Sequence, residues 1–330
     1  MKNDVYGIGN ALVDMEFEVE DSFFKTHDIE KGLMTLVDED RQNRLMSSID
    51  TAVAKKQCGG SAANTIIGVS QFGGKAYYSC KVANDELGDF YMQNLRDAGV
   101  DTNLKNGNRQ PGLTGKCLVM ITPDADRTMN TFLGITSSFS KEELDPEAIK
   151  NSKYIYLEGY LITSPTGKAA MIEAKKIAEE NGVKVAITLS DPSIVNFFKA
   201  DFEEVIGSGV DLLFCNEDEA LAYTGAENLL GARELLKNVA KNFAITLGSN
   251  GASIFDGDTF IDIESYKVEA VDTNGAGDMF AGAFLYGITH DHTHAQAGKI
   301  ASLASSKIVS KFGPRLENNQ AQEILDHLLN

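Results

Sequence analysis

The chain has 330 residues, of which 43% are hydrophobic and 24% charged, a balance typical of a folded protein with one main domain and a small appendage. Its 48 acidic and 30 basic residues give a formal net charge of −18 at pH 7, which argues against nucleic acid and anionic membranes as partners. Four separated cysteines without a C-x-x-C pair, and no apolar run of about 20 residues, favour a cytoplasmic protein over a disulfide-bonded or membrane-spanning one.

The first half of the chain contains several short apolar runs that are typical of strands. Strands are expected over 4–10, 12–19, 32–37, 75–82, 114–121 and 127–133, and helices from Asp38 to Ile49, from the turn at 59–64 to Gly73-Gly74, and over 86–98. The last two strands read as a hairpin around the turn at 123–126. Four of these strands, 12–19, 32–37, 114–121 and 127–133, would suit a small separate sheet.

From residue 154 onward, strands and helices alternate, which predicts parallel strands joined by right-handed crossovers. Strands are expected over 154–160, 183–190, 211–215, 243–247, 252–256 and 259–264, and helices over 165–181, near 199–207, after 216, over 277–288, over about 293–310 and from about 319. Ligands of such sheets bind beyond the carboxyl ends of the strands. Asn10, Asn216, Gly248 and a glycine turn at 275–277 all fall at such ends.

The stretch 271–285 joins this glycine turn to an apolar helix. Gly275 and Gly277 can adopt backbone angles that a side chain would forbid, so successive amide groups can point into one hollow at the positive end of the helix. Asp278 lies in the first turn, where a carboxylate can simply favour the helix dipole or can act on a bound group. An anion hollow with an acid directed into it suits a reaction that brings a hydroxyl to a phosphate.

Other polar residues follow strands in positions where they can meet a ligand. An ionised carboxylate only accepts hydrogen bonds, so Asp14 could bind two neighbouring hydroxyls of a ligand; the alternative is a solvent-exposed strand position. Gly59 and Gly60 would let the backbone approach a ligand that the amide of Asn64 could face. The alternative for these glycines is a plain tight turn.

Three other patterns are weaker. Residues 7–9, Gly-Ile-Gly, could begin a dinucleotide fingerprint, but Leu12 stands where the third glycine is needed and a strand is expected where that fold needs a helix. No G-x-x-x-x-G-K-[ST] phosphate loop occurs. His290, His292 and His294 alternate as metal ligands on a strand can, although their position between two helices favours a solvated loop.

Residues 272–278, Asp-Thr-Asn-Gly-Ala-Gly-Asp, resemble position for position the C-terminal signature of the ribokinase-like (PfkB-type) carbohydrate and nucleoside kinases. A second family pattern stands at 59–64, Gly-Gly-Ser-Ala-Ala-Asn, more than 200 residues upstream, so the resemblance spans nearly the whole chain. It implies one kinase domain over 1–330 with a three-layer α/β/α fold, a mostly parallel central sheet covered by helices on both faces. It also implies a discontinuous β-sheet lid, formed by about 12–37 and 112–134, over the substrate.

The resemblance implies transfer of the γ-phosphoryl group of ATP to a primary hydroxyl. Asp278 would be the base, and the amides of Gly275, Ala276 and Gly277 would hold the phosphoryl group. The substrate would contact Asn10, Asp14, Gly59, Gly60, Asn64 and the lid residue Arg127, which could move onto the phosphates. ATP would contact Asn216, Thr246, Gly248, Gly251 and Asn274, with Mg²⁺ held near Asn216 and Glu219 through water. Some relatives bind K⁺ near the residue that corresponds to Asp272.

Residues 9–14 and 312–316 are most similar to the adenosine-kinase-like branch of the family, which favours a purine nucleoside as the substrate. Large apolar residues of the expected lid strands could stack on a purine: Phe17, Leu33 or Met34, Leu36, Met129, Phe132 and Leu133. They could instead pack against the main domain or against a second subunit, so the chain is expected to be a monomer or a lid-mediated homodimer. The alternatives in function are a free sugar kinase of the ribokinase or fructokinase type and a nucleotide-binding regulator without turnover.

Overall fold

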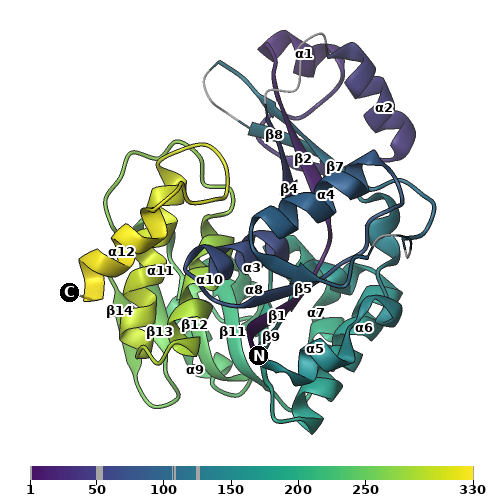
Figure 1. Cartoon of the computed structure of the whole chain (residues 1–330). Helices are drawn as coiled ribbons and strands as arrows, with labels where there is room; N and C mark the ends of the chain where they lie inside the picture. The colour runs from purple at the N-terminus through teal and green to yellow at the C-terminus, as the bar shows by residue number, and fades with distance from the viewer. Residues whose placement is uncertain (1, 50–54, 106, 108, 124–126, 330) are drawn as a thin grey trace.

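The computed structural model describes residues 2–49, 55–105, 107, 109–123 and 127–329 (Figure 1). Nine strands among them form the main sheet in the order β14-β13-β12-β11-β10-β9-β1-β5-β6. Neighbouring strands are parallel, except that β13 is antiparallel to both β12 and β14. The strands are β1 (Asn3–Ile8), β5 (Ala76–Ser79), β6 (Val100–Thr102), β9 (Ser152–Leu157), β10 (Lys184–Thr188), β11 (Val210–Asn216), β12 (Ala240–Thr246), β13 (Ala252–Phe255) and β14 (Phe260–Ile263).

Helices cover both faces of this sheet, which confirms the predicted three-layer α/β architecture. Successive strand residues point to opposite faces, so Val5 joins one apolar core while Tyr6 and Ile8 join the other. The Val5 face packs against α3 (Ser61–Gln71), α4 (Glu86–Asp97), α10 (Ala276–Thr289), α11 (His294–Val309) and α12 (Gln320–Leu329). The Tyr6 face packs against α5 (Pro146–Lys150), α6 (Pro165–Glu180), α7 (Pro192–Ile206), α8 (Glu217–Thr224) and α9 (Leu229–Leu236).

A second sheet stands at the carboxyl end of β1, at the top of Figure 1. Its order is β3-β8-β7-β2-β4, with β2 (Leu12–Glu18), β3 (Met34–Leu36), β4 (Lys55–Gly59), β7 (Gly115–Ile121) and β8 (Arg127–Phe132). Helix α1 (Asp21–Thr26) connects β2 to β3, and helix α2 (Glu39–Ser48) lies between β3 and β4 in the chain. Strands β7 and β8 pair antiparallel as predicted, while residues 124–126 of the predicted turn at 123–126 lie outside the described residues.

Local capping explains several helix starts. Asp38 accepts the Arg41 amide at the start of α2, as predicted. Helix α7 begins at Pro192, earlier than the expected 199, because the Asp191 side chain accepts amides of the first turn and proline suits the first helical position. The α7 helix is kinked at Phe198, whose backbone is not helical.

Several short elements were not predicted. They are β4, β6, α1, α5, α9 and the 3₁₀ helices η1 (Gly134–Ser138), η2 (Lys141–Glu143), η3 (Gly159–Thr163) and η4 (Gly248–Asn250). In the described part of the chain, no helix is both long and apolar enough to cross a membrane.

Candidate active site

The glycine turn begins helix α10 in the way its sequence suggests. Gly275 is the residue before the helix and adopts a left-handed conformation with φ of 76°. A Cβ at this position would overlap the ring of Pro314, so a side chain is excluded by both backbone angle and space. Gly277 has open space where a Cβ would lie. The turn therefore leaves room for a group to approach the amides at the start of α10.

Asp278 is held by the neighbouring helix α3. Its two carboxylate oxygens accept hydrogen bonds from Ser61 Oγ at 2.7 Å and from Asn64 Nδ2 at 3.0 Å. Burial raises the pKa of Asp278 to about 6, while the hydrogen bonds from Ser61 and Asn64 oppose that rise. The Asp278 carboxylate therefore links the first turns of α3 and α10. A carboxylate that only stabilised the dipole of its own helix would not need these contacts with α3.

Close packing of the two helices makes this meeting possible. A Cβ at Gly282 of α10 would lie 3.2 Å from Gly68 Cα and would crowd the Thr65 carbonyl oxygen. Gly60 precedes α3 as Gly275 precedes α10, and neither glycine offers a side chain to cap its helix. Two positive helix ends therefore lie at one place, which favours the binding of an anion.

Glu158, which follows β9, is a candidate site residue that the sequence analysis did not identify. It is 1% exposed, and its carboxylate accepts hydrogen bonds from Asn10 N at 3.0 Å, Asn10 Nδ2 at 3.1 Å and Ala62 N at 2.8 Å. Burial raises its pKa to about 7, against the opposing effect of these donors. Glu158 thus ties the end of β1 to the start of α3. The available signal was an acid at the end of an apolar strand.

Asn10 lies between Glu158 and η1. Thr136 Oγ1 donates to Asn10 Oδ1 at 3.4 Å, and the Tyr78 hydroxyl donates to the Asn10 carbonyl oxygen at 3.0 Å. Gly60 has φ of 101°, and a Cβ there would overlap the same carbonyl oxygen. The Asn10 side chain is therefore held in one orientation, and Gly60 permits the close approach of the two segments.

Asp14 lies on β2 against Gly59 of the neighbouring strand β4. A Cβ at Gly59 would overlap the Asp14 carboxylate, so the glycine provides the space in which that group lies. Burial raises the pKa of Asp14 to about 7, opposed mainly by the nearby charge of Arg315. Within the described part of the chain, no hydrogen bond reaches this carboxylate. The geometry leaves its oxygens able to accept hydrogen bonds from a ligand.

Arg127 joins the second sheet to the glycine turn. Its guanidinium lies 3.0 Å from Asp272 Oδ2 and 3.4 Å from Glu16 Oε1, and it lies over the Phe312 ring. Asp272 also accepts the amide hydrogens of Asn274 and Gly313. Asn274 Nδ2 approaches Met129 Sδ of β8 at 4.0 Å. The predicted movement of Arg127 onto phosphates would have to break the ion pair with Asp272.

The predicted magnesium pair forms a capping box at the start of α8. Asn216 Oδ1 accepts Glu219 N at 2.8 Å, and the Glu219 carboxylate accepts Asn216 N at 3.1 Å and Asn216 Nδ2 at 2.8 Å. Glu219 is buried, and burial raises its pKa to about 7. Among the residues that the structure describes, no group of three or more His, Cys, Asp or Glu side chains could hold a metal ion.

The expected ATP loop lies next to this pair. Thr246 ends β12 and is the register partner of Asn216 in the parallel ladder. Gly248 and Gly251 follow with φ of 56° and 89°, and a Cβ at Gly251 would overlap the Ile263 carbonyl oxygen. The loop conformation thus depends on glycine at both positions. Thr246 and Asn216 are brought together, as expected for residues that end neighbouring parallel strands.

His290 and His292 belong to the connection from α10 to α11, and His294 is the first residue of α11. His290 Nδ1 lies 2.9 Å from the Tyr286 carbonyl oxygen, and its ring stacks on the Tyr286 ring. His294 packs near Phe284, and burial lowers its pKa. The histidine side chains are therefore less exposed than a solvated loop would predict, because His290 packs on Tyr286 and His294 packs near Phe284.

Comparisons with known proteins agree with this arrangement. The model of the pfkB family carbohydrate kinases matches residues 34–321. The solved adenosine kinase from Sinorhizobium meliloti is 35% identical with a TM-score of 0.90, over 99% of this chain and 100% of that one. A solved probable sugar kinase from Rhizobium etli is 33% identical with a TM-score of 0.89, over 99% of both chains. The adenosine kinase of Saccharomyces cerevisiae is 27% identical over 334 residues, 93% of this chain and 95% of that protein.

The sequence, the fold and these similarities lead to the same assignment, and the resemblance inferred from residues 272–278 is confirmed. The chain belongs to the pfkB family of carbohydrate kinases and is a phosphotransferase that acts on an alcohol hydroxyl group.

Proposed function

We propose that this kinase transfers the γ-phosphoryl group of ATP to a primary hydroxyl of a purine nucleoside, with Asp278 as the base. The observation that carries the proposal is the position of Asp278, where the first turns of α3 and α10 meet. A negatively charged phosphoryl group would be stabilised by the amides of Gly275, Ala276 and Gly277 at the positive end of α10.

The carboxylate of Asp278 has properties that suit a general base. A pKa of about 6 leaves it mostly ionised at neutral pH while keeping its proton affinity close to the working pH. The donors Ser61 and Asn64 fix its orientation. Asp278 would accept the proton of the attacking hydroxyl, and most of the rate enhancement would come from positioning the hydroxyl against the phosphoryl group.

Mg²⁺ fits the oxygen donors beside the expected ATP loop. The Asn216 amide oxygen and both Glu219 carboxylate oxygens take part in the capping box, and their remaining lone pairs could hold the waters of such an ion. When bound, Mg²⁺ would offset part of the triphosphate charge. Thr246, Gly248, Gly251 and Asn274 would line the rest of the ATP site.

A cavity of about 270 Å³ beside Asn10 supports a nucleoside as the acceptor. Leu133, Phe139, Tyr160 and Leu161 are among its lining residues. Phe139 and Leu161 are nearly fully buried, so Leu133 and Tyr160 would supply most of the apolar surface for a purine ring. The polar part of the lining, which could bind hydroxyl groups, consists of Asn10, Thr136, Ser137, Thr163 and Ser164. The ribose would then lie between Asp278 and the cavity beside Asn10, which would hold the purine. Asn10, Asp14 and Asn64 could bind the ribose hydroxyls there.

The apolar residues of the second sheet support this proposal less than the sequence suggested. Phe17 is 4% exposed, because the face of β2 that carries its side chain is packed in the apolar core. Leu33, Met34 and Leu36 are exposed by 48%, 44% and 59% near the edge strand β3. Of the apolar residues that the sequence analysis proposed to stack on a purine, Leu133 alone lines the cavity beside Asn10. We propose that the second sheet acts as a lid that excludes water during transfer.

A substrate panel tests the proposal. Adenosine, inosine, guanosine, ribose and fructose would each be supplied with ATP and Mg²⁺, and ADP formation would be measured. We expect the highest kcat/KM for a purine nucleoside. A higher kcat/KM for ribose or fructose than for every nucleoside would replace the nucleoside by a free sugar. No acceptor-dependent ADP formation with any of them would point to an alcohol acceptor outside this panel and would refute the nucleoside proposal.

A further inference from the structure

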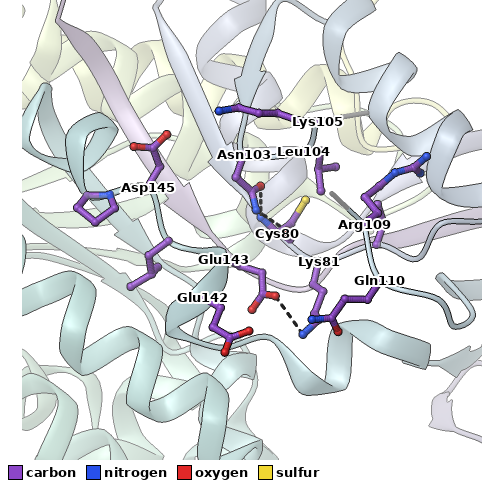
Figure 2. A pocket seen from close by; sticks show the side chains of 13 residues that line it. Cys80, Lys81, Asn103, Leu104, Lys105, Arg109, Gln110, Glu142, Glu143 and Asp145 are labelled. Carbon is purple, nitrogen blue, oxygen red and sulfur yellow. Dashed lines mark hydrogen bonds and ion pairs between the residues drawn. The ribbon is translucent and has the colours of Figure 1, made fainter. Parts of the chain in front are cut away.

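A second cavity, of about 480 Å³, lies beyond the carboxyl ends of β5 and β6 (Figure 2), and its lining includes neither Asp278 nor Asn10. Lys81 and Glu143 face each other on its wall. Lys81 Nζ lies 3.0 Å from Glu143 Oε1, and the two side chains are only 9% and 12% exposed. Burying a lysine costs free energy that an ion pair does not always recover, so the presence of this pair is weak evidence that it stabilises the fold.

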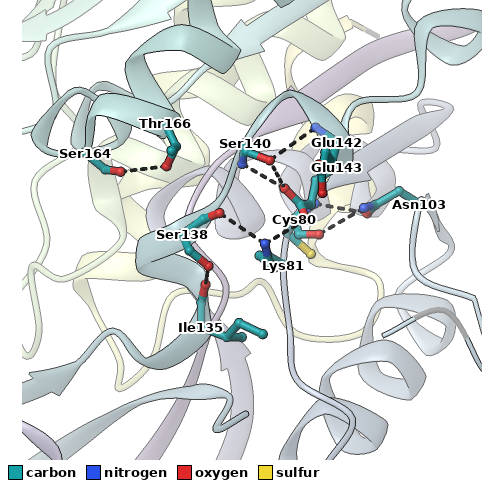
Figure 3. Close-up of polar contacts among 10 residues, drawn as sticks. All are labelled: Cys80, Lys81, Asn103, Ile135, Ser138, Ser140, Glu142, Glu143, Ser164 and Thr166. Atoms are coloured by element: carbon teal, nitrogen blue, oxygen red, sulfur yellow. Dashed lines mark hydrogen bonds and ion pairs between the residues drawn. The ribbon is translucent and has the colours of Figure 1, made fainter. Parts of the chain in front are cut away.

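Both partners of the pair also hold the segment between η1 and η2 (Figure 3). Lys81 Nζ donates to the Ser138 carbonyl oxygen at 3.1 Å, at the end of η1. Glu143 Oε2 accepts Ser140 N at 2.8 Å and Ser140 Oγ at 2.9 Å, which caps η2. The ion pair therefore fastens residues 138–143 to the end of β5.

The fastened segment reaches the candidate acceptor site through η1. Thr136, two residues before Ser138, is 1% exposed. Its hydroxyl oxygen accepts Ala11 N at 3.0 Å and donates to Asn10 Oδ1 at 3.4 Å. A displacement of η1 would therefore remove one of the two side-chain contacts that hold the Asn10 amide, the other being its hydrogen bond from Nδ2 to Glu158 Oε1 at 3.1 Å. Lys81 is connected to Asn10 through a single turn of 3₁₀ helix, with contacts of 3.1 Å to Ser138 and 3.4 Å from Thr136 to Asn10.

We infer that Lys81 is a positioning residue for the acceptor substrate, acting through Ser138 and Thr136 on Asn10. This inference rests on the proposed function in one respect, namely that Asn10 binds the acceptor. Lys81 itself lines the separate cavity and not the cavity beside Asn10 that is proposed for the acceptor. Its removal should consequently weaken acceptor binding more than it affects ATP binding or the rate of transfer.

The test compares Lys81→Met with Lys81→Arg and with Lys175→Met as a matched control. Lys175 is buried to the same extent, 8% exposed, and pairs with Glu179 at 2.9 Å on α6. The acceptor would be the compound with the highest kcat/KM in the substrate panel. We expect Lys81→Met to raise the acceptor KM about tenfold with the ATP KM nearly unchanged, whereas Lys175→Met changes neither. Lys81→Arg, which keeps the charge, should restore most of the acceptor affinity.

A second variant tests the path. Thr136→Val keeps the shape of the side chain but removes the hydroxyl that contacts Asn10 and Ala11. If Lys81 acts through Thr136, adding Lys81→Met to Thr136→Val should raise the acceptor KM much less than Lys81→Met does alone. Fully additive effects, or an acceptor KM for folded Lys81→Met within about twofold of the parent value, would overturn the inference.

Hydrogen exchange provides a readout that does not depend on turnover. Peptides that contain Ala11 and residues 134–138 should exchange faster in Lys81→Met than in the parent, and Lys175→Met should leave them protected. Unchanged exchange in both segments would overturn the connection even if the enzyme proved to use another substrate. Faster exchange without any phosphotransfer in the panel would instead place the failure in the proposed function.

Discussion

Asn64 of α3 donates a hydrogen bond from Nδ2 to Asp278 Oδ2 of α10 across 3.0 Å, while the Oδ1 atom of the same amide is buried without a partner in the described part of the chain. A buried acceptor without a partner costs free energy in the unliganded state. A substrate hydroxyl could supply the missing donor. The Asn64 amide could therefore bind the attacking group with one end while it orients the base with the other.

This relationship predicts a change in the pH dependence of the Asn64→Ala variant. The Asn64 hydrogen bond stabilises ionised Asp278, so its loss should raise the pKa of Asp278 further above 6. The acid limb of the kcat profile should move upward by roughly one pH unit, with a larger loss of rate at pH 6 than at pH 8. Ser70→Ala on the same helix is the control, and an acid limb that stays in place would remove Asn64 from the support of the base.

Asp14→Ala should chiefly weaken acceptor binding. The loss of a charge-assisted hydrogen bond should make the binding free energy of the acceptor less favourable by about 1.5–3 kcal/mol. Because the pKa of Asp14 is about 7, acceptor binding by the parent should also weaken as the pH falls below 7. A 2′-deoxynucleoside is the matching probe. Equal use of ribo and deoxyribo substrates by the parent would show that Asp14 does not bind the vicinal hydroxyls.

Glu219→Gln should raise the Mg²⁺ concentration needed for half-maximal rate, by about tenfold if the carboxylate orients the waters of the ion. The exposed neighbour Asp218 offers a control that changes charge at the same helix end, so Asp218→Asn should have little effect. A magnesium titration of Glu219→Gln that superimposes on that of the parent would leave Glu219 only its capping function at α8.

The raised pKa of Asp278 predicts a stability cost of the base. Its folded-state pKa of about 6 exceeds the ordinary value of 3.8, so the folded protein binds the proton more tightly than the unfolded chain. Ionised Asp278 therefore destabilises the fold above pH 6, and this cost disappears as the pH falls below 4. Thermal unfolding of Asp278→Asn should occur at a higher temperature than that of the parent at pH 8 but not at pH 4. A lower melting temperature for the variant at pH 8 would contradict this.

The sequence was informative where the fold depends on local pattern. The alternation from residue 154 onward predicted the parallel strands, and strand ends then placed Asn216 beside Thr246. The first turn at Gly275 was predictable because its backbone angle requires glycine. Strand β4 was missed because Lys55, Lys56 and Gln57 show no apolar alternation, and its strand conformation depends on pairing with β2.

Contacts between distant segments could not be predicted. Glu158 has an unremarkable sequence position, and its importance comes from donors 148 and 96 residues away. Arg127 was expected to be a lid residue that could move onto the phosphates, and this stays a prediction. Its ion pair with Asp272 could not be foreseen, because only the fold shows that β8 lies against the glycine turn. The sequence left open whether Phe17 stacks on a ligand or packs against the main domain, because a strand pattern does not say which face of a small sheet is buried, and the structure places Phe17 in the core. The proposed roles of the site residues stay predictions.

The central claim is that Asp278 is the base of phosphoryl transfer, and the rate of Asp278→Asn tests it most directly. The substitution keeps the size of the side chain and the positions of Ser61 and Asn64 but removes the proton acceptor. With the best acceptor of the panel, saturating ATP and Mg²⁺ at pH 7.5 or thereabouts, kcat should fall by about 10²–10⁴-fold while the affinity for ATP stays nearly unchanged. A folded Asp278→Asn enzyme that keeps more than roughly half of the parent kcat would contradict the account.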